Sequence, residues 1–149
     1  MLALGLQGSP LKKGSTDYLL ARFMDELEAH GVRTTIVDVP RKNIHPCRGC
    51  GFCEKKGFCV IDDVDMSKGI YSLLREAEIV VAASPVFFYS VPAQLKALID
   101  RAQTLWSRKY RFGLADPLKK TRIGCLLSKG GSRRRQHLDG DNHVAKILF

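Results

Sequence analysis

Four of the five cysteines in this chain lie within thirteen consecutive positions and form the pattern C-x2-C-x2-C-x5-C. They are Cys47, Cys50, Cys53 and Cys59. Two-residue spacing brings thiolates close enough to share one metal centre, which favours metal or redox chemistry over a disulfide framework. The spacing is close to the ferredoxin pattern C-x2-C-x2-C-x3-C-P. Because four thiolates also suit tetrahedral zinc, an iron-sulfur cluster, a zinc site and metal-free thiols all remain open.

A second candidate site is the loop that follows the apolar run Leu2–Leu6. It contains hydroxyls at Ser9, Ser15 and Thr16 and two adjacent lysines, and it opens a helix. Backbone N–H groups at a helix N-terminus, together with cations, attract phosphate. The loop matches neither the Walker pattern nor G-x-G-x-x-G. A phosphate cradle is therefore one interpretation, and a plain connection capped by Ser15 or Thr16 is the other.

Aromatic residues follow another apolar run, Ala77–Ala83. Exposed rings at the end of a strand are expected to stack on a flat ligand, and a local hydrophobic cap is the alternative. Gly130 and Gly131 follow the apolar run Ile123–Leu127, where they either let a ligand approach the backbone or form a turn. Cys125, inside that run, is expected to be a core residue.

Apolar runs alternate with segments of helical periodicity, which predicts a parallel sheet with right-handed crossovers in one domain, residues 1–149. Open parallel sheets bind ligands at the carboxyl ends of their strands. A cysteine-rich insert is expected at about 46–63, leaving the same sheet edge as the candidate phosphate loop. The predicted strands are Leu2–Leu6, Val32–Val39, Ala77–Ala83 and Ile123–Leu127. Four helices are predicted. The first carries Leu19 to Leu27 and ends at Gly31, and the second carries Ile70 to Leu74 and begins with a cap at Asp65 or Ser67. The third begins at Pro92 and carries Leu95 to Ala102, and the fourth includes His143 to Phe149.

Charge and hydropathy narrow the function classes. The chain has a formal net charge of +9. Its basic residues concentrate between Arg101 and Arg135, where the only acid is Asp116. A solvated basic face is expected there, while Asp62, Asp63 and Asp65 are expected to favour the positive end of the following helix.

No apolar run reaches the roughly 20 residues of a membrane span, and the N-terminus does not resemble a secretory signal, so a cytoplasmic protein is expected.

The motifs together resemble a known family. Residues 8–16 are similar to the FMN phosphate loop of the NADPH-dependent FMN reductase group of flavodoxin-like proteins. Residues 84–96, S-P-V-F-F-Y-S-V-P-A-Q-L-K, are similar to the loop and helix that hold its isoalloxazine ring. Residues 46–53 and 57–63 resemble the cysteine motif of the iron-sulfur flavoprotein branch. The resemblance extends to about Ser132.

The resemblance implies a flavodoxin-like, doubly wound sheet of order 2-1-3-4, with the family's fifth strand apparently missing from this chain. It implies bound FMN, a [4Fe–4S] cluster on the four clustered cysteines, NAD(P)H as a possible co-substrate, and a homodimer or homotetramer. The phosphate would be held by Ser9, Lys12, Gly14, Ser15 and Thr16. The ring would be bracketed by Pro85, Val86, Phe87, Phe88 and Tyr89, with Gly130 and Gly131 near its far edge.

The function implied is electron transfer between the cluster and FMN by an oxidoreductase, with no separate catalytic residue assigned. One alternative is an NAD(P)H-dependent FMN or quinone reductase without a cluster. Another, from a different class, is a zinc-stabilised basic module that binds nucleic acid, although aromatic residues of the kind that single-strand binders use are sparse here.

Overall fold

Four segments of the chain form one parallel sheet. The computed structural model describes residues 1–114 and 122–129, and its strands lie in the order β2-β1-β3-β4. The predicted flavodoxin-like order 2-1-3-4 is therefore confirmed. The strands are β1 (Leu2–Gln7), β2 (Arg33–Asp38), β3 (Ile79–Pro85) and β4 (Ile123–Lys129).

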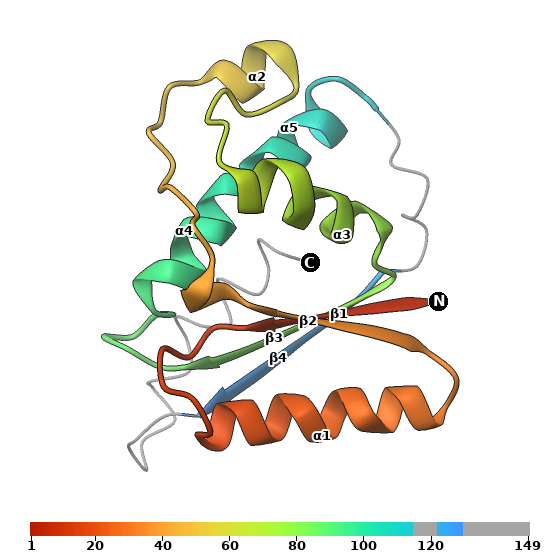
Figure 1. The fold of residues 1–149 in the computed structure, drawn as a ribbon. Helices are drawn as coiled ribbons and strands as arrows, with labels where there is room; N and C mark the ends of the chain where they lie inside the picture. The colour runs from red at the N-terminus through yellow and green to blue at the C-terminus, as the bar shows by residue number, and fades with distance from the viewer. Residues whose placement is uncertain (115–121, 130–149) are drawn as a thin grey trace.

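Helices cover both faces of the sheet (Figure 1). On one face lies α1 (Ser15–Ala29); the other carries α3 (Tyr71–Glu76), α4 (Ala93–Arg101) and α5 (Gln103–Tyr110). Every residue of β1 is buried, which explains its unbroken apolar sequence. One core cluster packs between the sheet and the α3 and α4 face, and a second packs against α1.

The predicted end of α1 at Gly31 is confirmed. Gly31 has a φ of +78°, a left-handed conformation that glycine adopts without steric cost. At the other end, Gly14 is the N-cap, so Ser15 and Thr16 are the first two residues of the helix and neither occupies the cap position that the alternative interpretation of the loop gave them.

The second predicted helix begins differently from the prediction. A π-helical turn, Met66–Ile70, leads directly into α3, and neither Asp65 nor Ser67 caps it through its side chain. The Asp65 carboxylate instead accepts the backbone N–H of Asn43 and pairs with Lys42 at 3.2 Å. Asp65 therefore holds the segment at Lys42 and Asn43, which is distant in sequence, and does not cap a helix.

Two helices were not predicted. The short α2 (Phe52–Lys56) lies inside the cysteine-rich insert, and α5 lies in the basic segment between Arg101 and Arg135, for which no helix was predicted beyond Ala102. Cys125 is half-buried against the α1-side cluster, and burial raises the pKa of its thiol.

Gly130, Gly131 and the helix predicted at 143–149 lie outside the described residues. Within the described ranges no helix has the length and apolar character needed to cross a bilayer.

Candidate functional site

The candidate phosphate loop and the aromatic loop leave the same edge of the sheet. Strands β1 and β3 are parallel neighbours with Gln7 opposite Ala83, and the Gly8 N–H donates to the Ala83 carbonyl at 2.8 Å. A Cβ at Gly8 would lie 2.5 Å from Cδ2 of Leu95. Glycine at this position therefore lets α4 approach the end of β1 and brings both loops together.

Side chains inside the candidate phosphate loop fix its shape. The Gln7 side chain accepts the Ser9 N–H and donates to the Asp17 carboxylate. The Asp17 carboxylate also accepts the Lys13 N–H at 2.5 Å, and Lys13 has a φ of +56°. The Ser9 hydroxyl accepts the Leu11 N–H at 3.2 Å. The loop is thus held by its own hydrogen bonds before any ligand enters.

The predicted phosphate residues are gathered around the start of α1. Ser9 and Thr16 are buried, whereas Lys12 and Ser15 are exposed. The sequence analysis missed Gln7 and Asp17, which organise the loop. Asp17 could have been found, because an acid at the third position of a helix commonly bonds back to a preceding N–H. The helix N-terminus and two lysines outweigh this one carboxylate and favour an anion.

The aromatic loop is a tight two-residue turn. Phe87 and Ser90 exchange both backbone hydrogen bonds, at 2.7 and 2.9 Å, and φ is +45° at Phe88 and +61° at Tyr89. Two positive φ angles are typical of a type I′ hairpin turn, which usually contains Asn and Gly. Bulky residues adopt this conformation rarely. Backbone strain of this kind is concentrated at functional sites.

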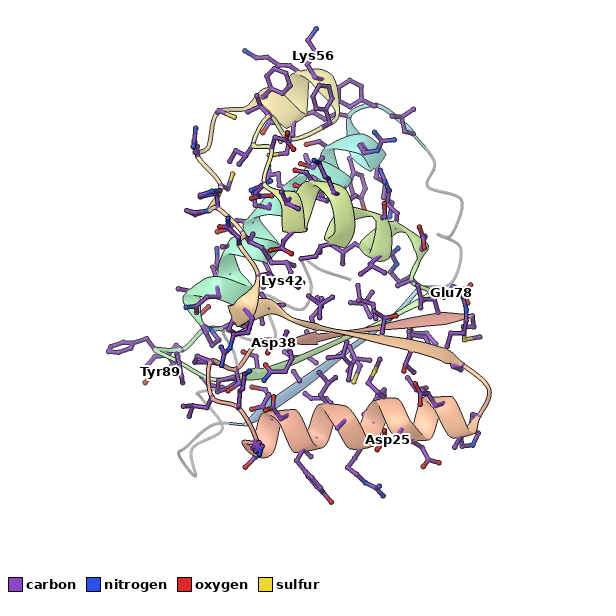
Figure 2. The ribbon with its side chains drawn as sticks, in the orientation of Figure 1. Asp25, Asp38, Lys42, Lys56, Glu78 and Tyr89 are labelled. Atoms are coloured by element: carbon purple, nitrogen blue, oxygen red, sulfur yellow. The ribbon has the colours of Figure 1, made fainter. Side chains whose placement is uncertain are left out.

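The rings of this turn lie open to solvent. Phe88 is completely exposed and Tyr89 is 59% exposed, and Figure 2 shows Tyr89 at the tip, pointing away from the sheet. These rings are too exposed to form the hydrophobic cap considered as an alternative. Pro85 and Val86 are half-buried beneath them, so the loop presents flat apolar surface on a fixed base.

The four clustered cysteines line one cavity of about 130 Å³. All four are free thiols; Cys47 and Cys50 are exposed, and Cys53 and Cys59 are half-buried. Left-handed glycines on either side of Cys50, both with φ above +60°, allow the segment to wind tightly around the cavity. Within residues 1–114 and 122–129, however, no three His, Cys, Asp or Glu side chains are gathered closely enough to hold an ion.

A buried ion pair anchors the cysteine segment. The Arg101 side chain donates to Asp63 at 2.6 Å, and the exposed fractions of these two side chains are 0% and 1%. Burial would raise the pKa of Asp63, but the hydrogen bonds from Arg101 and from the His45 N–H, together with the charge of Arg101, outweigh burial and lower that pKa. The prediction for Arg101 is wrong, because this residue is buried and does not lie on a solvated basic face. The carbonyl of Asp63 accepts the Ser67 N–H at 2.9 Å at the start of the following helix, and the predicted effect of its carboxylate on that helix end stays a prediction.

The sequence contained a signal for the burial of Arg101. It lies three residues after Leu98, on the apolar stripe of α4. A charge on such a stripe is buried only when it is paired. Its partner could not be identified from the sequence, because Asp63 is 38 positions away.

The cysteine cavity and the aromatic loop lie at opposite ends of α4. Asp100 and Arg101 at the C-terminus of this helix line the cavity, while the aromatic loop precedes its N-terminus. Nine helical residues span roughly 13 Å. The cysteine segment starts near the phosphate loop, where Arg41 donates to the Pro10 carbonyl at 3.1 Å. Because β2 ends beside β1, with Asp38 opposite Gln7, the prediction that this segment leaves the same sheet edge as the phosphate loop is confirmed. The segment then runs away from the sheet to α2 (Figure 1).

Known proteins provide an independent comparison. The sequence profile described as NADPH-dependent FMN reductase matches residues 1–138. The chain belongs to the NADPH-dependent FMN reductase family. Among its relatives is an iron-sulfur flavoprotein of Methanosarcina thermophila, 38% identical over 133 residues, covering 89% of this chain and 65% of the relative. An iron-sulfur flavoprotein of Methanocaldococcus jannaschii is 34% identical over 134 residues, covering 89% and 64%.

This member of the FMN reductase family thus spans just under two thirds of the length of those relatives. Solved structures agree on the fold. An FMN-dependent NADH-azoreductase from Bacillus anthracis, in complex with FMN, has a TM-score of 0.67 at 13% identity, covering all of this chain and 76% of that one. An NADH:FMN oxidoreductase has a TM-score of 0.66 at 16% identity, covering 99% and 67%.

Proposed function

We propose that this chain is an electron-transfer flavoprotein of the iron-sulfur type. FMN would bind at the edge formed by β1 and β3, and a [4Fe–4S] cluster would bind to the four clustered cysteines. The observation that carries the proposal is that four free thiols line a single cavity in a chain whose sheet edge presents exposed rings beside a preformed loop at the N-terminus of α1. The iron-sulfur flavoproteins among its relatives support the same assignment.

The residues at the sheet edge fit FMN. The preformed loop would place the phosphate at the N-terminus of α1, within reach of Lys12 and the hydroxyls of Ser9, Ser15 and Thr16. The turn would orient the ring system against its own side chains, since aromatic stacking stabilises a flat ligand by roughly 0.5–1.5 kcal/mol per ring. The turn residues that we propose bracket the ring are Pro85, Val86, Phe87, Phe88 and Tyr89. Like these, Gly130 and Gly131 near the far edge of the ring remain predictions.

The donor set of the cavity fits an iron-sulfur cluster. Thiolate sulfur is the ligand that such clusters require, and four thiols are available from one short segment. When bound, FMN supplies one- and two-electron chemistry and the cluster supplies one-electron chemistry. The protein binds and orients both groups and keeps them apart along α4. A homodimer or homotetramer, in which a neighbouring copy covers the exposed rings, belongs to the same proposal.

The second candidate is an NAD(P)H-dependent FMN or quinone reductase without a cluster. It is favoured by one observation: the described thiols line the cavity but are not gathered as a ligand set.

The nucleic-acid-binding alternative has less support, because several basic residues of its expected face have partners. Arg101 pairs with Asp63, Arg111 pairs with Glu54 at 3.1 Å, and Arg122 donates to backbone carbonyls.

Anaerobic purification followed by reconstitution with iron and sulfide tests the cluster. We expect about four iron and four sulfide per chain, together with bound FMN and broad visible absorption. Cys53→Ala is expected to lose iron and sulfide, while Cys125→Ala, the matched control outside the cavity, should retain them. FMN without iron, in protein that oxidises NAD(P)H, would identify the reductase instead, and colourless protein containing zinc would contradict both.

Comparing FMN with riboflavin tests the phosphate cradle. Lys12→Gln is expected to weaken FMN binding about two- to fivefold, as for a solvent-exposed charge pair, and to leave riboflavin binding unchanged. Lys55→Gln on α2, an exposed lysine far from the loop in sequence, is the control. Equal losses for FMN and riboflavin would show that Lys12 does not contact the phosphate.

A further inference from the structure

Arg101 is a buried cation beside the cysteine cavity, and one of its nitrogens has no partner. The residue is 1% exposed and lines the cavity. Its Nε is buried and finds no hydrogen-bond acceptor in the part of the chain that the structure describes. An unsatisfied buried donor costs roughly 1–3 kcal/mol. Such a group in a folded protein calls for an explanation, which can be local strain, a bound water or ion, or a redox or catalytic role.

The other two nitrogens of the guanidinium hold both ends of the cysteine segment. Nη1 donates to the His45 carbonyl at 2.9 Å, two residues before the first cysteine. Nη2 donates to the Ile61 carbonyl at 3.0 Å, two residues after the last cysteine. Both nitrogens also reach the Asp63 carboxylate, at 2.6 and 3.3 Å. A planar fork of this kind fixes orientation as well as distance.

Cys59 and Arg101 both line the cysteine cavity. Burial alone would lower the pKa of Arg101, but hydrogen bonds to Asp63 and Tyr71 raise it. The Tyr71 hydroxyl donates to the Arg101 carbonyl at 2.9 Å and fixes the backbone of this residue. The guanidinium is therefore held in one place, in a residue that lines the same cavity as Cys59.

We propose that Arg101 is a positioning residue of the cysteine site. Its Nη groups hold the two ends of the cysteine segment together, and its Nε–H donates a hydrogen bond to a cysteine sulfur, that of Cys59, when the cavity is loaded. This inference rests on the proposed function, because it assumes that the thiols bind a group there. A donor to a thiolate ligand stabilises negative charge, so it favours the reduced cluster and raises its reduction potential.

Arg101→Lys is the informative variant, because it keeps the charge but loses the planar fork and the Nε–H. Arg122→Lys is the matched control. Arg122 also uses its guanidinium to hold backbone carbonyls, those of Leu74, Arg75 and Ala77, but it does so at the end of α3 and does not line the cysteine cavity. Both variants lose hydrogen bonds from a guanidinium to backbone carbonyls, and Arg101→Lys also disturbs the ion pair with Asp63. Only Arg101→Lys is expected to affect the cysteines.

Two measurements report on the cysteine site without relying on activity. Titration of the reduced, metal-free chain with Co²⁺ measures how well the thiolates are positioned, and Arg101→Lys is expected to bind 10- to 100-fold more weakly, in line with loss of an outer-shell partner. In the reconstituted protein, a redox titration followed by electron paramagnetic resonance is expected to give a lower cluster potential. A tenfold change in the reduction equilibrium corresponds to 59 mV for one electron. Arg122→Lys should match the wild type in both.

The outcomes separate this inference from the proposed function. If the wild type takes up the cluster but Arg101→Lys matches Arg122→Lys in both measurements, the inference is overturned and the proposed function stands. If the wild type binds neither Co²⁺ nor a cluster, both are overturned. Should Arg101→Lys fail to fold, the wild type labelled with ¹⁵N decides: slower exchange of the Arg101 Nε–H on loading with Cd²⁺ supports the hydrogen bond, and an unchanged rate overturns it.

Discussion

Replacing the turn residues Phe88 and Tyr89 by Asn and Gly is expected to stabilise the protein and weaken its binding of FMN. Both residues have positive φ angles, which Asn and Gly adopt readily. Phe88 is completely exposed, so folding gains nothing from burial of its ring. The double variant Phe88→Asn/Tyr89→Gly therefore removes strain and the proposed flavin contacts in a single step.

The size of both effects follows from the geometry of the turn. A left-handed conformation costs an L-residue roughly 1–2 kcal/mol, so relief at two positions is worth about 2–4 kcal/mol. The added glycine takes back about 0.5–1 kcal/mol in chain entropy, and the lost contacts of the partly buried Tyr89 ring take back up to about 1 kcal/mol. At the midpoints of these ranges the net gain is about 2 kcal/mol, which raises the Tm by about 4–8 °C at this chain length. Loss of two stacked rings weakens FMN binding about 5- to 150-fold.

Thermal unfolding of the flavin-free protein and titration of FMN fluorescence measure the two effects separately. Phe88→Ala is the matched control, because it removes the same ring but leaves a non-glycine residue at positive φ. It should weaken FMN binding without raising the Tm. A double variant with a Tm at or below that of the wild type would refute the argument from strain, and an unchanged FMN affinity would refute the role of the rings.

Two further predictions concern the core that positions the loops. Gly8→Ala is expected to lower the free energy of unfolding by about 1–3 kcal/mol, because its added Cβ would meet the side chain of Leu95. Gly69→Ala is the control, since no atom lies within 4 Å of its added Cβ, and it should not lower the free energy of unfolding. Urea unfolding measures both variants, and equal effects would contradict the argument. Because hydrogen bonding to Arg101 lowers the pKa of Asp63 below the ordinary 3.8, the pair stabilises the fold above that pH and is lost as the pH falls through the lowered value. In acid titrations of stability Asp63→Asn should flatten this part of the curve, and an unchanged curve would show that the pair contributes nothing.

Local patterns of sequence were enough to predict the framework. The unbroken apolar runs of β1 and β3 are typical of strands buried on both faces, and Gly31 marks the end of α1. Helix α5 escaped prediction because its sequence, QTLWSRKY, carries few apolar residues. It lies against α2, so packing between two segments, and not helical periodicity, stabilises it. The turn at Phe88 was also hidden, since nothing in two adjacent aromatic residues indicates a positive φ.

The sequence by itself determined which residue types are available and in what order: four closely spaced thiols, a hydroxyl-rich loop after the first strand and an aromatic loop after a central one. These features are local, so periodicity and spacing reveal them. The tertiary structure alone decided that Arg101 reaches across 38 positions to Asp63 and that the cysteine cavity lies one helix length from the aromatic loop. Such relations depend on which segments pack together, and a buried charge is stable only where packing brings it a partner.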